Sequence, residues 1–142
     1  EDKVLKVMRK PTFDLFYKFK SFFDKVNSAN GLKQQLIPYF ISSHPGSSEG
    51  DMAELAVKTK ELNFKLEQIQ DMTPTPMTVA SVIYYSGYHP YTLKKIYTAK
   101  TKEQKLSQRM FFFWYKKENR QQIISKLKHI KRSDLIKKLF SK

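Results

Sequence analysis

Apolar side chains near the start of the chain recur at the spacing of an α-helix in two successive segments. The first segment carries Val4, Leu5 and Met8. It should end before Pro11, because proline disfavours helical geometry in the residue that precedes it. The second helix should follow Thr12, a capping residue type, and end at Asn30-Gly31. Its apolar positions are Leu15, Phe16, Phe19, Phe22, Phe23 and Val26.

The next part of the chain has the pattern of a strand, a helix and a second strand. Residues 35–42, QLIPYFIS, form a nearly continuous apolar run, which is typical of a strand covered on both faces. Pro38 within this run favours an edge position, since proline donates no ladder hydrogen bond. Ser48 and Asp51 have capping-box spacing and predict the start of a helix. Residues 64–70 favour a second strand, so the segment predicts a βαβ unit with parallel pairing.

The remainder of the chain predicts mainly helices. Residues 71–78 form a loop rich in proline and threonine, residues 78–85 fit one or two helical turns, and residues 93–99 favour a short edge strand. Three further helices should begin after the capping residues Thr101, Asn119 and Ser133. Their expected buried positions are Leu106, Met110, Phe113 and Trp114, then Ile123, Ile124, Leu127 and Ile130, then Leu135, Ile136, Leu139 and Phe140.

The composition adds several exclusions. With 142 residues, 40% of them apolar, the chain is long enough for one folded core. It has no cysteine, and its three histidines lie far apart in the sequence, which argues against a self-contained metal site. No apolar stretch approaches the ~20 residues that cross a bilayer, and no signal peptide is visible, so we expect a cytoplasmic protein without a membrane partner. The chain opens on Glu1 inside a helical pattern, which favours a piece of a longer polypeptide.

Charge divides the chain into two unequal parts. Residues 1–92 hold 11 Lys and Arg against 10 Asp and Glu, whereas residues 93–142 hold 16 against 3. We therefore expect residues 1–92 to carry the βαβ unit and residues 93–142 to form a basic helical region with a different role. Such an excess of cations attracts RNA or another polyanion through counterion release. The cations that we expect to make this contact are Lys94, Lys95, Lys116, Lys117 and Arg120.

Five consecutive aromatic residues lie within this basic region, in the segment RMFFFWYKK at residues 109–117. Exposed aromatic rings among cations stack unpaired bases. The alternative is a buried aromatic helix, which we favour because five adjacent aromatic side chains point all round a helix and most must be in the core.

The two loops that follow the predicted strands are the candidate site. Ligands of α/β folds bind beyond the carboxyl ends of parallel strands, so the loops at residues 42–48 and 71–78 should face one pocket. The first loop offers Ser42, Ser43, His44 and free amides at a helix start, a setting that suits an anion. The second offers Asp71, Thr73 and exposed carbonyls. The same residue types also form ordinary turns, and on residue type alone this second interpretation is favoured. The sequence has no paired carboxylates, no Ser/His/Asp arrangement and no glycine-rich phosphate loop.

Four motifs together resemble the YgiQ family of radical S-adenosylmethionine (SAM) proteins: KVLKVMRKP, LIPYFISSHPGSS, QIQDMTPTPMT and YYSGYHP. In the methylthiotransferase-like branch of these enzymes, an apolar strand ends in a Gly-aromatic-Pro-Gly turn. Pro45 and Gly46 match this turn, whereas Ser43 and His44 stand in its Gly and aromatic positions. The second loop is similar to the family pattern at Thr73, Pro74, Pro76, Thr78 and Ala80.

The resemblance covers essentially the whole chain and implies an α/β fold: the βαβ portion of a partial (β/α) barrel with a helical, basic C-terminal extension. It implies that the intact protein binds a 4Fe–4S cluster and SAM in a reaction not yet assigned. The family's Cys-x-x-x-Cys-x-x-Cys motif is absent, so an upstream region of the same polypeptide would hold the cluster, and this chain alone would bind no cofactor and be inactive. The residues implied to lie near the adenosyl part of SAM are Ile41, Ser43, His44, Asp71, Met72 and Thr73.

Overall fold

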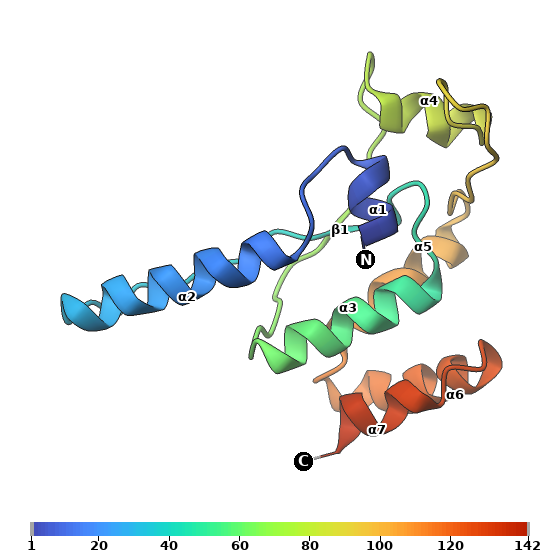
Figure 1. The fold of residues 1–142 in the computed structure, drawn as a ribbon. Helices are drawn as coiled ribbons and strands as arrows, with labels where there is room; N and C mark the ends of the chain where they lie inside the picture. Colours follow the sequence, from blue (N-terminus) through green and yellow to red (C-terminus); the bar gives the residue numbers. More distant parts are fainter. Residues whose placement is uncertain (1, 142) are drawn as a thin grey trace.

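Helices make up most of the regular structure of residues 2–141, the part of the chain that this computed structural model describes (Figure 1). The elements in chain order are α1 (Asp2–Val7), α2 (Asp14–Ala29), β1 (Ile41–Ser42), α3 (Glu49–Glu61), β2 (Gln70–Asp71), α4 (Val79–Ser86), α5 (Lys102–Arg109), the 3₁₀ helices η1 (Met110–Phe113) and η2 (Lys117–Asn119), α6 (Arg120–His129) and α7 (Asp134–Phe140). None of these helices is long and apolar enough to cross a membrane.

The two strands pair in parallel, as the βαβ pattern predicts, but the sheet is much shorter than expected. Ile41 lies opposite Gln70 and Ser42 opposite Asp71. The preceding residues of both predicted strands stay unpaired and line a groove of about 900 Å³ between residues 35–39 and 63–70. Pro38 offers no N–H to a neighbouring strand, and Ile37 is 90% exposed, so nothing within residues 2–141 covers this edge. The partial barrel itself stays a prediction.

One hydrophobic core joins α3 to the C-terminal helices. α3 packs against η1, α5 and α7. The buried members are Met52, Ala53, Ala56, Val57, Leu66, Phe111, Phe112, Ile123, Leu127, Leu135 and Leu139. Residues on both sides of the predicted division at residue 92 therefore contribute to the same core.

The aromatic run is part of this core, which confirms the favoured interpretation. Phe111 and Phe112 are fully buried, the Trp114 indole donates to Thr59 Oγ1 (3.2 Å), and the Tyr115 hydroxyl donates to the Leu66 carbonyl (2.6 Å). The expected buried face of this segment was wrong, however, because Leu106 is 49% exposed. α5 ends at Arg109 and tightens into η1, and this change of helical period turns different side chains inward.

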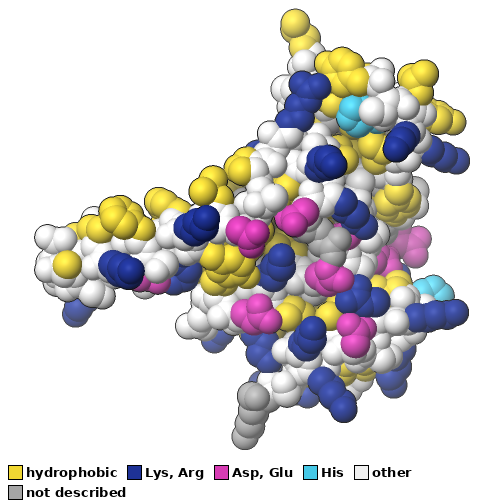
Figure 2. All heavy atoms as spheres, viewed as in Figure 1, with side chains coloured by type: hydrophobic (Ala, Val, Ile, Leu, Met, Phe, Trp, Pro, Cys, Tyr) yellow, Lys and Arg dark blue, Asp and Glu magenta, His cyan; other side chains and the backbone are white. Residues whose placement is uncertain are grey.

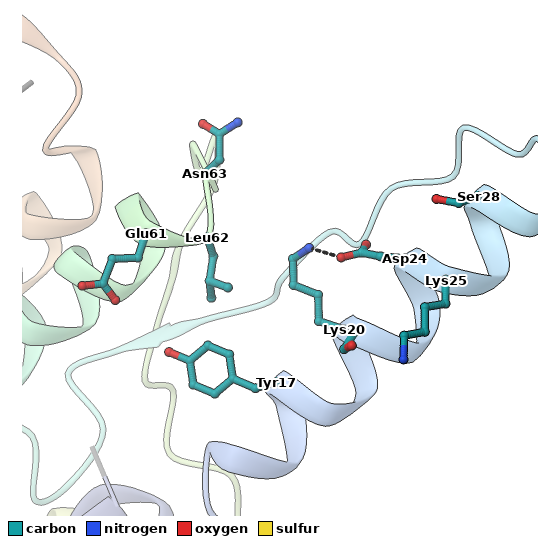
Figure 3. A pocket seen from close by; sticks show the side chains of 9 residues that line it. Tyr17, Lys20, Asp24, Lys25, Ser28, Glu61, Leu62 and Asn63 are labelled. Atoms are coloured by element: carbon teal, nitrogen blue, oxygen red, sulfur yellow. Dashed lines mark hydrogen bonds and ion pairs between the residues drawn. The ribbon is translucent and has the colours of Figure 1, made fainter.

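Helix α2 projects from the rest of the molecule and has no buried residue. Most of its apolar stripe faces solvent, with Phe22 68% exposed, while Phe16 packs on the Phe64 ring (6.3 Å between centroids); Figure 2 shows hydrophobic side chains along this arm. Figure 3 shows the cleft of about 720 Å³ between α2 and the C-terminal end of α3. Lys20 and Asp24 pair with each other in this cleft (2.6 Å), and none of the predicted site residues lines it.

Helix caps follow the predictions only in part. Ser48 and Thr101 both form capping boxes, with Asp51 and Gln104 respectively. The predicted cap at Thr12 is wrong, since the N-cap of α2 is Phe13, and Asn119 and Ser133 make no capping hydrogen bond. The predicted strand at residues 93–99 is also absent: the structure has a single antiparallel bridge there, between Tyr88 and Lys95.

Candidate functional site

The two candidate loops leave the same edge of the sheet, because β1 and β2 run parallel. The Met72 amide donates to the Ser42 carbonyl (2.8 Å) and continues the pairing one residue beyond β2. The turn before α3 and the loop before α4 therefore start side by side, as the βαβ pattern predicts.

The turn after β1 is an ordered and buried structure. Ser42, Ser43, His44, Pro45 and Ser47 are all buried. Ser43 has a φ of +60°, a conformation that glycine adopts without steric cost and that other residues rarely take. This geometry fits the family pattern, in which glycine stands at the position of Ser43.

A clamp from the C-terminal region holds the turn. Gln108 is fully buried, and its Nε2 donates to the Ser47 carbonyl while its Oε1 lies 3.0 Å from Ser47 Oγ. The Gly46 amide donates to the Tyr97 carbonyl (2.8 Å). Both ends of the Gln108 amide face Ser47, whose hydroxyl also lies 2.6 Å from the His44 carbonyl, so α5 fixes the position of the turn.

A buried carboxylate anchors the other side of the turn. Asp51 is 3% exposed, and its Oδ2 accepts from the Ser48 amide at the start of α3 (2.7 Å). Its Oδ1 pairs with Lys3 Nζ of α1 (2.8 Å). The ion pair supplies the counter-charge that a buried carboxylate needs, and it joins α1 to the start of α3.

His44 lines a cavity of about 240 Å³ that three segments enclose: the end of α1 with the residues after it, β1, and the start of α4. The lining residues are Val7, Met8, Arg9, Lys10, Ile41, His44, Thr78, Val79 and Ala80. His44 Nδ1 lies 2.9 Å from the Pro45 carbonyl and donates to it, which leaves Nε2 as the ring nitrogen that accepts from a ligand.

Acid is expected to destabilise the fold through His44. Burial lowers the pKa of His44 below its ordinary value of 6.5, and the charge of Lys10 adds to this effect, while the hydrogen bond to Pro45 opposes it. The unfolded chain therefore takes up a proton more readily than the folded chain does. The stabilisation is complete above pH 6.5 and declines as the pH falls toward the lowered pKa.

Thermal unfolding at about pH 7.5 and about pH 5 measures this effect. His44→Gln should lose less stability between the two than the wild type does. His129→Gln, on an exposed position of α6, is the matched control and should behave as the wild type. Equal losses in the wild type and His44→Gln would contradict the assignment.

The structure brings together only part of the predicted cofactor set. Ile41 and His44 both line the cavity, and Ser43, which precedes His44 in the sequence, is buried. Asp71, Met72 and Thr73 do not line it: Met72 is buried, and Thr73 is exposed. Asp71 Oδ2 lies 3.6 Å from Arg109 Nη1, and its Oδ1 is buried without a hydrogen-bond partner among residues 2–141. That oxygen is an unused acceptor next to the edge of the sheet.

The predicted polyanion-binding set separates into two groups. Lys94 and Lys95 are exposed in the loop after α4. Lys116, Lys117 and Arg120 lie around η2 at the start of α6, where Lys116 and Arg120 are over the rings of Phe113 and Phe140. Figure 1 shows these groups at opposite ends of the molecule.

Sequence patterns missed Gln108 and the cavity residues from α1 and α4. In a polar helix, no sequence pattern distinguishes a buried glutamine such as Gln108 from a solvent-exposed glutamine. Lys10 falls inside the motif KVLKVMRKP, and Ala80 is one of the positions that match the family pattern, which was the available signal for the cavity. The site as built has a hydrogen-bond acceptor, an apolar wall and nearby cations, which suits part of a polar heterocyclic ligand.

Comparisons with known proteins complete the description. Residues 67–139 match the profile described as Domain of unknown function (DUF3362). The chain is 61% identical over 99% of its length to a UPF0313 protein of Bacteroides thetaiotaomicron, and 62% identical over 99% to one of Porphyromonas gingivalis. It is 37% identical over 94% of its length to a UPF0313 protein of Methanocella arvoryzae. The chain spans 23%, 22% and 22% of these three relatives. No solved structure matches it significantly.

Proposed function

Because the chain belongs to the DUF3362 family and aligns almost throughout with UPF0313 proteins, the YgiQ family, we propose that it forms part of the SAM pocket of a radical SAM iron–sulfur enzyme. The observation that carries the proposal is the parallel pairing of β1 and β2, which starts both SAM-like loops at one edge. The remaining part of such a polypeptide, upstream of this chain, is the partner that this proposal requires.

The residues present fit one side of an adenosyl group. His44 Nε2 accepts from a donor such as an amino group, and Ile41 with Val79 and Ala80 offers an apolar surface to a flat ring. The unpaired Asp71 Oδ1 is a further acceptor nearby in the sheet. A cavity of about 240 Å³ is smaller than a typical ligand pocket, so another segment must complete the site.

The residues of this chain do not fit the 4Fe–4S cluster, because the sequence contains no cysteine to bind it. A bound cluster would supply the electron for SAM cleavage, and its thiolate ligands would come from another segment. The residues of this chain then have two roles: they orient the adenosyl group through His44 and the turn that Gln108 clamps, and they exclude water from one side of it.

Anaerobic reconstitution with iron and sulfide, followed by SAM and dithionite, tests this proposal. The 142-residue chain is expected to give no charge-transfer absorbance and no 5′-deoxyadenosine, whereas a longer protein that includes it is expected to give both. Both signals from this chain alone, or neither from the longer protein, would refute the proposal.

A substitution in the longer protein tests the assigned pocket. Ala80→Phe fills the cavity beside His44 and should weaken SAM binding by about tenfold or more without loss of iron. Val82→Phe is the matched control, since Val82 lies on the same helix with an exposed side chain. Equal SAM affinity in the two variants would place the adenosyl site elsewhere.

We propose polyanion binding, for example of RNA, as a second function. It is supported by the exposed cations Lys94, Lys95 and Lys117, which make no ion pair within residues 2–141. Other cations of the basic region are used internally: Lys126 pairs with Glu49, and Arg132 pairs with Glu54 and Asp134. Titration with RNA at several salt concentrations should give a steep log–log slope, and no binding at low salt would exclude this function.

A further inference from the structure

Residues 72–102 contain no aspartate or glutamate, although they carry five of the eight tyrosines and four lysines. This segment includes α4 and the loop after it, residues 79–97, which we call the tyrosine lobe. Tyr85, Tyr88, Tyr91 and Tyr97 are between 48% and 72% exposed. Figure 2 shows hydrophobic, histidine and cationic side chains at this end of the molecule, without the acidic side chains seen lower down. Such a surface combines aromatic faces with uncompensated positive charge.

The backbone of the tyrosine lobe is held in place by its own hydrogen bonds. Gly87 ends α4 with a φ of +77°, and its carbonyl accepts from the Ile96 amide (2.7 Å). The His89 amide donates to the Lys94 carbonyl (2.9 Å), and the Leu93 amide donates to the His89 carbonyl (2.8 Å). These hydrogen bonds join residues 87 and 89 to residues 93–96 and so fix the backbone of the loop. The backbone that carries the tyrosines therefore loses little conformational entropy when a ligand binds.

Cations stand beside the tyrosine rings. Tyr88 and Lys95 are directly opposite in an antiparallel bridge, which puts their side chains on the same face. The Arg9 guanidinium lies over the Tyr91 ring, 4.9 Å from its centroid. Lys105 Nζ lies 5.3 Å from the centroid of the Tyr84 ring. A cation over a ring occupies that face, so a base stacks on the remaining face, and a cation beside a ring, as Lys95 is beside Tyr88, is placed to hold the phosphate.

We propose that the tyrosine lobe binds single-stranded nucleic acid, with bases stacked on Tyr88 and Tyr91 and phosphates held by Lys94 and Lys95. The proposal deepens the second proposed function and rests on it, and it assigns the site to one of the two cationic groups. A duplex hides its base faces, so exposed tyrosines favour an unpaired strand. The aromatic run at residues 111–115 offers less stacking surface, because Phe111 and Phe112 are fully buried and Trp114 packs against the core.

Fluorescence anisotropy of the 142-residue chain with labelled oligonucleotides of about 12 nucleotides tests the proposal. RNA, DNA of the same sequence and a duplex are titrated at several salt concentrations. Tyr88→Ala with Tyr91→Ala should weaken single-strand binding by about tenfold or more and leave the salt slope unchanged. Lys94→Glu with Lys95→Glu should weaken binding and reduce the slope by about one to two. RNA preferred over DNA, or equal binding of the two, both fit the proposed chemistry, since stacking needs no 2′-hydroxyl.

Lys116→Glu with Lys117→Glu is the matched control, because it makes the same charge change in the other cationic group. It should have a smaller effect than the change at Lys94 and Lys95. If the control pair has the larger effect, or the tyrosine pair has none, the lobe is not the site, although polyanion binding stands. Tighter binding of the duplex also overturns the proposal. No binding of any oligonucleotide at low salt rejects the lobe and the second function together.

Photo-crosslinking supplies a second readout that does not depend on variants. RNA that carries 4-thiouridine should crosslink to peptides within residues 79–97. Crosslinks confined to residues 109–120 would overturn the assignment. Circular dichroism of each variant checks that the exposed substitutions leave the fold intact.

Discussion

Phe112→Ala is expected to lower the free energy of unfolding by about 3–5 kcal/mol. Phe112 is fully buried, and its ring lies 5.9 Å from that of Phe40, so the substitution removes a large apolar surface and leaves a cavity. The site sits where η1 packs against α3, at the centre of the core that joins the βαβ segment to the C-terminal helices. Urea unfolding followed by circular dichroism measures the change.

Phe22→Ala is the matched control for this prediction. Phe22 lies on α2 with 68% of its surface exposed, so its loss should change the free energy of unfolding by less than about 0.5 kcal/mol. Similar effects of the two substitutions would mean that α2 packs against the core in solution.

Gln108→Ala should lower the free energy of unfolding by about 2–4 kcal/mol. The substitution leaves the Ser47 carbonyl without its buried donor, while the Ser47 hydroxyl keeps the His44 carbonyl (2.6 Å), and it opens a void under the turn. Gln108→Glu, which keeps the shape, should also destabilise at neutral pH, because a carboxylate cannot donate to the Ser47 carbonyl. Gln122→Ala, at an exposed position of α6, is the control.

Amide hydrogen exchange locates the effect of Gln108. Loss of the clamp should speed exchange at Gly46 and Ser47 more than in α3, because the turn depends on Gln108 and the helix has its own capping box. In the longer protein the same variant should weaken SAM binding if the turn orients the adenosyl group. Unchanged exchange at both amides would show that Gln108 is a packing residue only.

Features that depend on neighbouring residues in the sequence were predicted well. The capping boxes at Ser48 and Thr101 need only a side chain and an amide three residues away, so their spacing was enough. The helical turns predicted at residues 78–85 correspond to α4. The parallel pairing followed from the order of strand, helix and strand.

Features that depend on distant contacts were not predictable in the same way. The length of β1 depends on what lies beside residues 35–40, and no neighbour within residues 2–141 pairs with them. Leu106 is exposed and Gln108 is buried where α5 runs into η1, and no local pattern announces that change of helix type. In the candidate site, His44 and Ile41 were predicted from their positions in the motifs. The wall that α1 contributes to the cavity could be identified only from the three-dimensional structure.

The absence of buried residues in α2 also determines how the isolated chain melts. Helix α2 has 16 residues, none of them buried, and its ring contact with Phe64, made by Phe16, lies in its first turn, so beyond that turn its helicity rests mainly on local hydrogen bonds and intrinsic propensity. A peptide helix of this length is marginal in water, whereas the core around α3 unfolds cooperatively. We therefore expect α2 beyond its first turn to lose helicity gradually, at temperatures where the rest of the molecule is still native.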